Sequence, residues 1–199
     1  MIEGMSQRSD ALEDLREAAI EWAAGGRGQL IVDAAASALA ADVDSPTLRM
    51  LAGTPHVSAD EEASELAPQA FRELGLEISE QLSPEAHIEA ARQQARRFLA
   101  GQMSARELTG YLAGFYMAAG YPTDLQTWIG LDDYYDMLRD GVIGGSVSEI
   151  DRAVNAAAQD LVNHRKVEPV SIGSLFAAAP SPPQRLRDRV AAIFRRQGP

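Results

Sequence analysis

The chain has no cysteine and only one lysine, Lys166, among its 199 residues. The absence of cysteine excludes disulfide bonds, thiolate metal sites and cysteine nucleophiles, and it fits a reducing compartment. Aromatic residues are scarce, at 6 % of the chain, and no apolar run approaches the roughly 18 residues that a membrane span needs. No basic segment followed by an apolar stretch opens the chain, so we expect a cytoplasmic protein without a signal peptide.

Acidic residues outnumber basic ones by 29 to 18, which gives a formal net charge of -11. A chain this acidic is repelled by phosphate backbones, so nucleic acid is not expected as a partner. With 46 % apolar and 24 % charged residues, the composition is that of a folded domain with a buried core. The charge is uneven, because residues 182–199 hold five arginines and one aspartate, a net +4, while residues 1–181 carry -15.

Helical signals recur along most of the chain, and nothing alternates with the two-residue period of a strand. Serine or threonine followed three residues later by Glu or Gln predicts helix starts at Ser58, Ser104, Thr123 and Ser146. We therefore predict an all-α bundle of about eight helices, the fourth of them broken or kinked because Pro68 removes an interior hydrogen bond. The predicted helices cover residues 10–24, 28–41, 46–52, 59–74, 84–100, 105–119, 124–140 and 147–165.

Two regions interrupt the helical pattern. Residues 79–84 are the expected seam between an N-terminal helical half, residues 1–79, and a C-terminal four-helix unit, residues 84–165. The seam is short, so the halves are expected to pack together. Residues 166–183 read as a linker, rich in proline and alanine. Beyond it, residues 184–197 predict a basic amphipathic helix whose apolar side carries Leu186, Val190, Ile193 and Phe194.

Aspartates cluster near the end of the predicted helix 124–140. Because residues three, four and seven positions apart share a helix face, several of their carboxylates should lie together. Two tyrosines off the core stripe should sit beside them and add contact area at low entropic cost. The cluster predicts a surface that binds a basic protein partner. Its expected residues are Asp132, Asp133, Asp136, Asp140, Tyr116 and Tyr134.

The same cluster supports an alternative function. Asp132, Asp133 and Asp136 look like the aspartate-rich motif of isoprenoid synthases, which are also all-helical, and the resemblance implies Mg²⁺ ligands that hold a diphosphate substrate. The second metal motif of that family is missing, and the basic residues that would bind diphosphate are not near. We therefore favour a solvated acidic face with no cofactor, no metal and no catalytic residue over a magnesium enzyme.

Further candidates lie outside the aspartate cluster. Arg92, Arg96 and Arg97 form a basic face on the predicted helix 84–100 and are a candidate anion-binding set. A third function gives the basic C-terminal helix a scaffold or oligomerising role, in which it packs on the acidic body or on another copy. The sequence does not fix the oligomeric state. Histidines lack the spacing of metal ligands and are expected at the surface or its boundary: His56, His87 and His164.

Residues 96–165 combine a helix end at Gly101, a Ser-Ala-x-Glu helix start at Ser104, an aspartate-tyrosine run at 132–135 and a last helix opening near Ser148. In this order they resemble the small helical immunity proteins of bacterial toxins, of the colicin D immunity type. The resemblance implies a four-helix unit that neutralises a basic nuclease by presenting acids. We therefore predict a non-catalytic protein-interaction module for a basic partner, with toxin neutralisation as its sharpest form.

Overall fold

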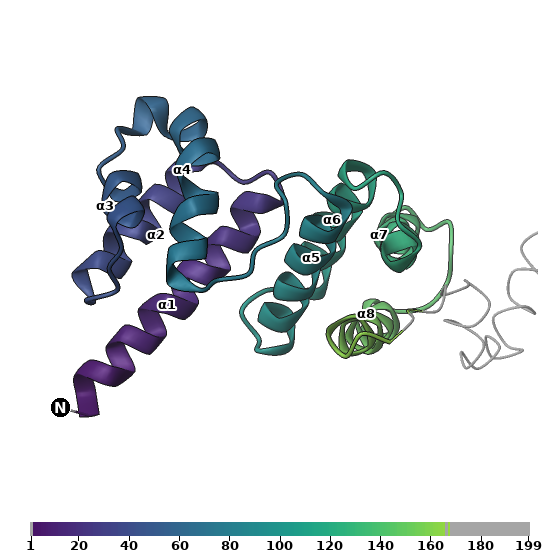
Figure 1. Ribbon diagram of the computed structural model, residues 1–199. Helices are drawn as coiled ribbons and strands as arrows, with labels where there is room; N and C mark the ends of the chain where they lie inside the picture. Colours follow the sequence, from purple (N-terminus) through teal and green to yellow (C-terminus); the bar gives the residue numbers. More distant parts are fainter. Residues whose placement is uncertain (1, 166, 168–199) are drawn as a thin grey trace, which may run out of the picture.

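A computed structural model describes residues 2–165 and residue 167, and this part of the chain is all-helical with no strand (Figure 1). The all-α prediction is confirmed, and most helix ends fall within a few residues of their predicted positions. The first helix is longer than predicted, since it begins at Ile2. The helices are α1 (Ile2–Ala23), α2 (Gly28–Ala40), α3 (Pro46–Ala52), α4 (Ala59–Leu74), α5 (Pro84–Leu99), α6 (Ala105–Ala118), α7 (Gln126–Arg139) and α8 (Val147–Val162), with short 3-10 helices η1 (His56–Ser58) and η2 (Thr123–Leu125).

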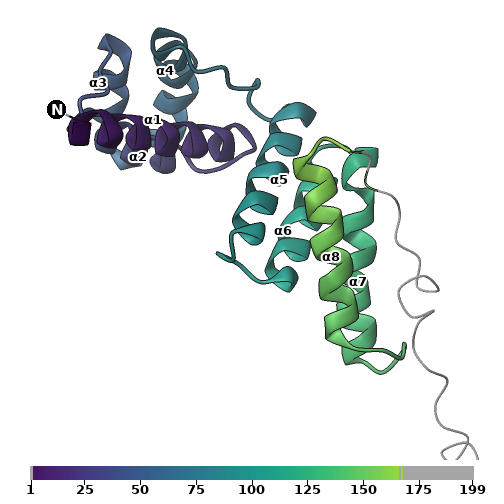
Figure 2. The same ribbon diagram turned by 90° about the horizontal axis from the view of Figure 1, so that it is seen from below.

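The helices form two groups that lie side by side (Figures 1 and 2). We call α1–α4 the N-terminal unit and α5–α8 the C-terminal unit. The axes of the four helices of the C-terminal unit are roughly aligned in the view of Figure 2, and α5 is the one nearest the N-terminal unit. The segment between α4 and α5, residues 75–83, crosses from one group to the other. No helix in the described part of the chain is both long and apolar enough to cross a membrane.

Each unit has a hydrophobic core of its own. The N-terminal core is built largely from alanines on α1, α2 and α4, which let the helices approach closely around Trp22 and Phe71, whose rings meet edge to face at 6.1 Å. The C-terminal core is centred on Trp128, which is fully buried among leucines of α6 and α7 and apolar residues of α8. The first turn of α5 adds Ala86 to the N-terminal core, so α5 serves both units.

Local capping explains where several helices begin. Ser45 and Ser83 accept backbone N–H groups at the starts of α3 and α5, each with proline as the next residue. At Ser104 the capping box is complete, because the Glu107 carboxylate also accepts the Ser104 N–H at 2.8 Å. A capping box also forms at Ser146, whose N–H donates to Glu149.

Three local predictions are wrong or incomplete. Ser58 does not cap α4 through the backbone, because its hydroxyl donates to Glu62 at 2.7 Å. Thr123 begins the 3-10 helix η2 rather than an α-helix, and α7 starts at Gln126. Pro68 does not break the fourth helix, since α4 runs unbroken from Ala59 to Leu74 with the proline on its exposed side. The proline removes one N–H donor and its ring crowds the carbonyl four residues earlier, but packing of the opposite face keeps the helix continuous.

The joint between the units is polar. The main helix contact across it is α1 on α5, where the Gln93 side-chain amide donates to the Glu17 carbonyl at 3.2 Å. The Gln93 Oε1 atom is buried and has no partner in the described residues. The Leu82 N–H donates to the Ala23 carbonyl at 2.7 Å, and the Tyr111 hydroxyl reaches Glu21 at 3.5 Å. The units therefore meet through a few polar bonds and the contact of Ala86 with the N-terminal core, while most of each core remains separate.

The predicted linker, residues 166–183, and the predicted basic helix, residues 184–197, lie outside the described residues except for Val167. Val167 is buried against the C-terminal core.

Candidate functional site

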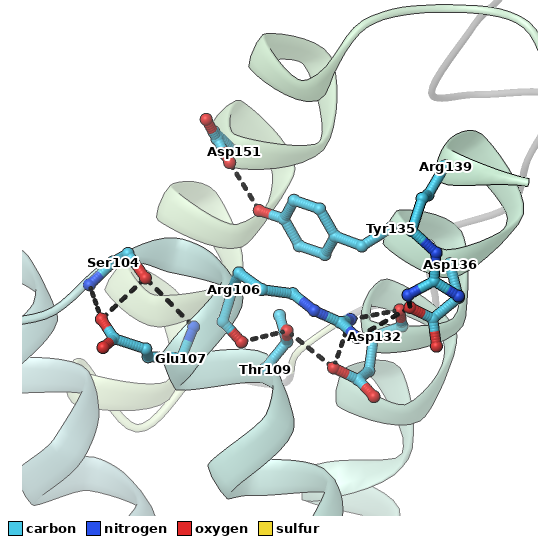
Figure 3. Close-up of polar contacts among 9 residues, drawn as sticks. All are labelled: Ser104, Arg106, Glu107, Thr109, Asp132, Tyr135, Asp136, Arg139 and Asp151. Carbon is cyan, nitrogen blue, oxygen red and sulfur yellow. Dashed lines mark hydrogen bonds and ion pairs between the residues drawn. The ribbon is translucent and has the colours of Figure 1, made fainter.

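The aspartate cluster lies on α7 and faces Arg106 of α6 (Figure 3). One guanidinium nitrogen of Arg106 is 2.7 Å from Asp132 Oδ1, and the other is 2.8 Å from Asp136 Oδ1. The buried Thr109 hydroxyl donates to the same Asp132 oxygen at 3.0 Å. A planar guanidinium fits two carboxylates in this way because its donors are fixed in a fork. Asp132 and Asp136 are thus neutralised inside the chain.

The remaining aspartates of the predicted surface differ from one another. Arg139, on the next turn of α7, binds Asp136 at 3.1 Å and Asp140 at 3.0 Å. Asp133 is exposed and makes no ion pair among the described residues. The cluster therefore presents one free carboxylate rather than four, because Arg106 and Arg139 take the others.

The two predicted tyrosines are not both at the surface. Tyr134 is only 9 % exposed and belongs to the C-terminal core, so its placement on the binding surface is wrong. The prediction failed because α7 is covered on more than one side, and the stripe read from the sequence was too narrow. Tyr116 is half-buried, and its ring meets that of the exposed Tyr121 edge to face at 5.2 Å.

Tyr135 connects the same cluster to α8. Its hydroxyl donates to Asp151 at 2.5 Å, and its ring lies 5.3 Å from the Arg106 guanidinium carbon, within cation–π range (Figure 3). Burial first, and then the Asp151 carboxylate, raises the pKa of Tyr135 above its ordinary value. Arg106, Asp132 and Tyr135 thus fasten three helices to one another.

The magnesium alternative finds no support in this arrangement. In the described part of the chain, no three His, Asp or Glu side chains are grouped so that they could hold a metal ion. The oxygens of Asp132 and Asp136 face Arg106 instead, and a guanidinium occupies the place where a cation would bind. The hydrogen bonds and ion pairs of the cluster hold α6, α7 and α8 together.

The histidines are only partly where the sequence placed them. His87 is buried, at 2 % exposed, which corrects the expected surface position. It lies on the inner side of α5, where Nδ1 is 2.8 Å from the Ser83 carbonyl and the ring meets Phe115 edge to face. His56 and His164 are exposed.

A cleft of about 1190 Å³ opens at the joint between the two units. We call it the joint cleft. Its walls are α1, α4 and α5, with residues 76–81 of the connecting segment and His164 just beyond α8. Half-buried Leu76, Ile78 and Ile88 give it an apolar floor.

The candidate anion-binding arginines are divided by this cleft. Arg92 and Arg96 line it, and both bind Glu89, at 3.4 and 3.3 Å. Arg97 lies away from it, beside Gln94 and the α1 side of α5. The three side chains therefore do not converge on one anion, and two of them already share a carboxylate.

In the joint cleft, the charged side chains that make no ion pair are mainly carboxylates. Glu77, Glu80 and Glu85 are exposed and make no ion pair within residues 6–165, the part whose side chains are described. Arg16 binds Glu13 at 3.4 Å, while the remaining arginine, Arg72, donates to the Pro68 carbonyl and has no acidic partner there. The lining as a whole holds four arginines and four glutamates and is neutral, but its groups without an ion pair are three carboxylates and the Arg72 guanidinium, beside an apolar floor.

Sequence reasoning missed both Arg106 and these glutamates as site residues. Arg106 gives no local signal, because its partners are on another helix more than twenty positions away. Glu77 and Glu80 lie between the predicted helices 59–74 and 84–100, and only Glu80 is within the predicted seam, residues 79–84. Comparisons of the chain with family models, with curated proteins and with solved structures found no match.

Proposed function

We propose that the chain is a non-catalytic protein-interaction module and that the joint cleft binds a basic amphipathic segment of a partner protein. The observation that carries this proposal is the set of unpaired glutamates, Glu77, Glu80 and Glu85, along a cleft with an apolar floor. Carboxylates beside half-buried apolar side chains suit a segment with arginines on one side and apolar residues on the other.

The proposal moves the binding site away from the predicted aspartate surface. Asp132, Asp136 and Asp140 are bound by Arg106 and Arg139, and a partner would have to displace these arginines to reach them. Glu77, Glu80 and Glu85 need no such exchange. Binding at the cleft therefore leaves the bonds within the C-terminal unit intact, which favours the cleft energetically.

The net charge of residues 1–181 supports a basic partner in general. A body that carries -15 attracts cations over a distance of about 8–10 Å at physiological salt and speeds their association. Neutralisation of a basic toxin, the activity implied by the immunity-protein resemblance, is the sharpest form of this function. The resemblance covers α6–α8, whereas the cleft also needs α1 and α4, so the proposal depends on the cleft alone.

The test is a titration of the full chain into a fluorescein-labelled peptide. The peptide has 14 residues, all leucine or arginine, with leucines at helical positions i, i+4, i+7 and i+8. Fluorescence anisotropy reports binding. The variant Glu77→Gln, Glu80→Gln, Glu85→Gln removes three charges at nearly constant shape and should weaken binding about tenfold at about 0.15 M salt, where the Debye length is about 8 Å.

The matched control is Asp133→Asn with Asp140→Asn, which removes acids from the predicted aspartate surface. It should leave the affinity within about twofold of the wild type, since the Debye length screens distant charges. Equal weakening in the two variants would mean that only net charge matters, and it would overturn the assignment of the cleft. If the peptide bound neither the wild type nor the variant Arg185→Glu, Arg187→Glu, Arg189→Glu, the proposed function would be overturned.

A further inference from the structure

The chain leaves the C-terminal unit beside the joint cleft. His164, two residues past the end of α8, lines the cleft, and Val167 packs on the C-terminal core. Residues 168–199 follow. The edge of the cleft is thus reached by a residue only three positions before Val167, the last residue that the structure describes.

The sequence of this following part has the chemistry that the cleft is proposed to bind. Residues 184–197 carry Arg185, Arg187 and Arg189 in the first half and two more arginines near the end, with a single aspartate. Leu186, Val190, Ile193 and Phe194 recur at helical spacing. The arginines of the segment are complementary to the unpaired glutamates of the cleft, Glu77, Glu80 and Glu85, and its apolar stripe matches the apolar floor.

The length between them is also sufficient. Sixteen residues, 168–183, separate Val167 from Gln184, and a flexible linker of that length spans about 20–24 Å on average. Fourteen residues in a helix are about 21 Å long. An attached segment is present at an effective concentration in the millimolar range, so even a modest intrinsic affinity would fill the site.

We propose that the joint cleft is occupied by the chain's own residues 184–197, which compete there with the basic segment of a partner. This inference rests on the proposed function, because it assigns a second occupant to the same site. It makes the C-terminal segment an autoinhibitory element, and a partner must bind more tightly than the attached segment to displace it.

The first test uses the absence of cysteine, which allows one label at a chosen position. Gln197→Cys carries a nitroxide in the full chain, and paramagnetic broadening of backbone amide signals is measured by NMR. Broadening should concentrate at residues 64–81 and 85–96. Broadening only at α7, or none in the described helices, would overturn the proposal.

A mixed sample separates the chain's own segment from that of a second copy. Isotope-labelled chain without the nitroxide is mixed with unlabelled chain that carries it. The proposal predicts little broadening in this sample. If the cleft amides broadened as strongly here as in the isotope-labelled chain that itself carries the nitroxide, a second copy would supply the segment. That result contradicts an intramolecular occupant.

The second test separates a failure of this inference from a failure of the function. Arg185→Glu, Arg187→Glu, Arg189→Glu in the full chain should release the cleft and strengthen binding of the leucine–arginine peptide about tenfold. The control replaces the same arginines with lysine and should bind like the wild type. Unchanged affinity in the glutamate variant overturns autoinhibition while leaving the function standing, whereas loss of peptide binding in all variants removes both.

Discussion

The two units join their helices through opposite arrangements of charge. In the N-terminal unit, carboxylates of α4 bind helix N-termini: Asp60 accepts the Gly28 N–H at 2.6 Å, and Glu73 accepts the backbone and hydroxyl of Thr47 at 3.0 and 2.6 Å. In the C-terminal unit, one guanidinium, that of Arg106, binds carboxylates of α7. Negative charge is stabilised by the helix ends in the first case and by a cation in the second.

This difference shows why the number of acids in a stretch of sequence does not locate a binding surface. In both units the acids nearest the core are used to hold helices together. Three of the acids left without an ion pair among the described residues, Glu77, Glu80 and Glu85, lie together at the joint, whereas others, such as Asp133 on α7 and Asp10 on α1, lie on other faces. A surface for a basic partner is therefore found by removing the acids that the fold already uses.

The largest expected effect tests whether the two cores are independent. The chain has two tryptophans, Trp22 in the N-terminal core and Trp128 in the C-terminal core, so each unit has its own fluorescent reporter. Leu131→Ala should destabilise the C-terminal unit, and Leu48→Ala the N-terminal unit, by about 2–5 kcal/mol, because both leucines are fully buried.

Urea unfolding in the Trp22→Phe and Trp128→Phe backgrounds follows one reporter at a time. Leu131→Ala should shift the Trp128 transition and leave that of Trp22 nearly unchanged, and Leu48→Ala should do the reverse. If either substitution moved both transitions equally, the two units would form one cooperative structure and the comparison would fail.

A smaller effect is expected from the arginine that fastens the C-terminal unit. Arg106→Met keeps the length of the side chain but leaves Asp132, whose side chain is 24 % exposed, without its cation. The unit should lose about 1 kcal/mol, since Arg106 is itself partly solvated. Arg139→Met is the control, because that arginine is well exposed and should cost little. Equal losses for the two variants would argue against a special role for Arg106.

The smallest effect concerns pH and separates the units by their chemistry. Hydrogen bonds from the Thr47 hydroxyl and backbone, and from Gln69, lower the pKa of Glu73 from 4.5 to about 2. A lowered pKa in the folded state adds stability that is complete above pH 4.5 and is lost as the pH falls toward 2.

Glu73→Gln should therefore flatten the acid dependence of the N-terminal unit, measured as the urea midpoint of Trp22 fluorescence between pH 5 and pH 2.5. The C-terminal unit, followed by Trp128, should titrate as in the wild type. If the pH dependence of the Trp22 midpoint were the same in Glu73→Gln and in the wild type, the hydrogen bonds from Thr47 to Glu73 would not stabilise the N-terminal unit.

Much of the fold could be predicted because its signals are local. Two helix starts are set by signals that span at most four residues, Ser83 with Pro84 and Ser104 with Glu107. The spacing of apolar residues marks the faces that pack. Local signals failed where a contact from another helix decides the outcome. Pro68 stays inside α4 because the opposite face of that helix is packed, and Ser58 binds Glu62 instead of the backbone.

The candidate site was harder to predict for the same reason. The spacing of Asp132 and Asp136 places them on one face of α7, as expected from the sequence. Only the packing of α6 on α7 brings Arg106 to them, and only the packing of α1 on α5, with α4 and residues 76–81 alongside, forms the joint cleft. Contacts between distant segments are not encoded in any single stretch, so the partners of the aspartates could not be read from it.

Hydrogen–deuterium exchange of the full chain, with and without the leucine–arginine peptide, tests the central claim most directly, because it reports every backbone amide at once. If the cleft at the joint is the binding site, the peptide should slow exchange in residues 76–81 and in α5, and leave α7 around Asp133 and Asp140 unchanged. Protection centred on α7, with none in the connecting segment, would contradict the account.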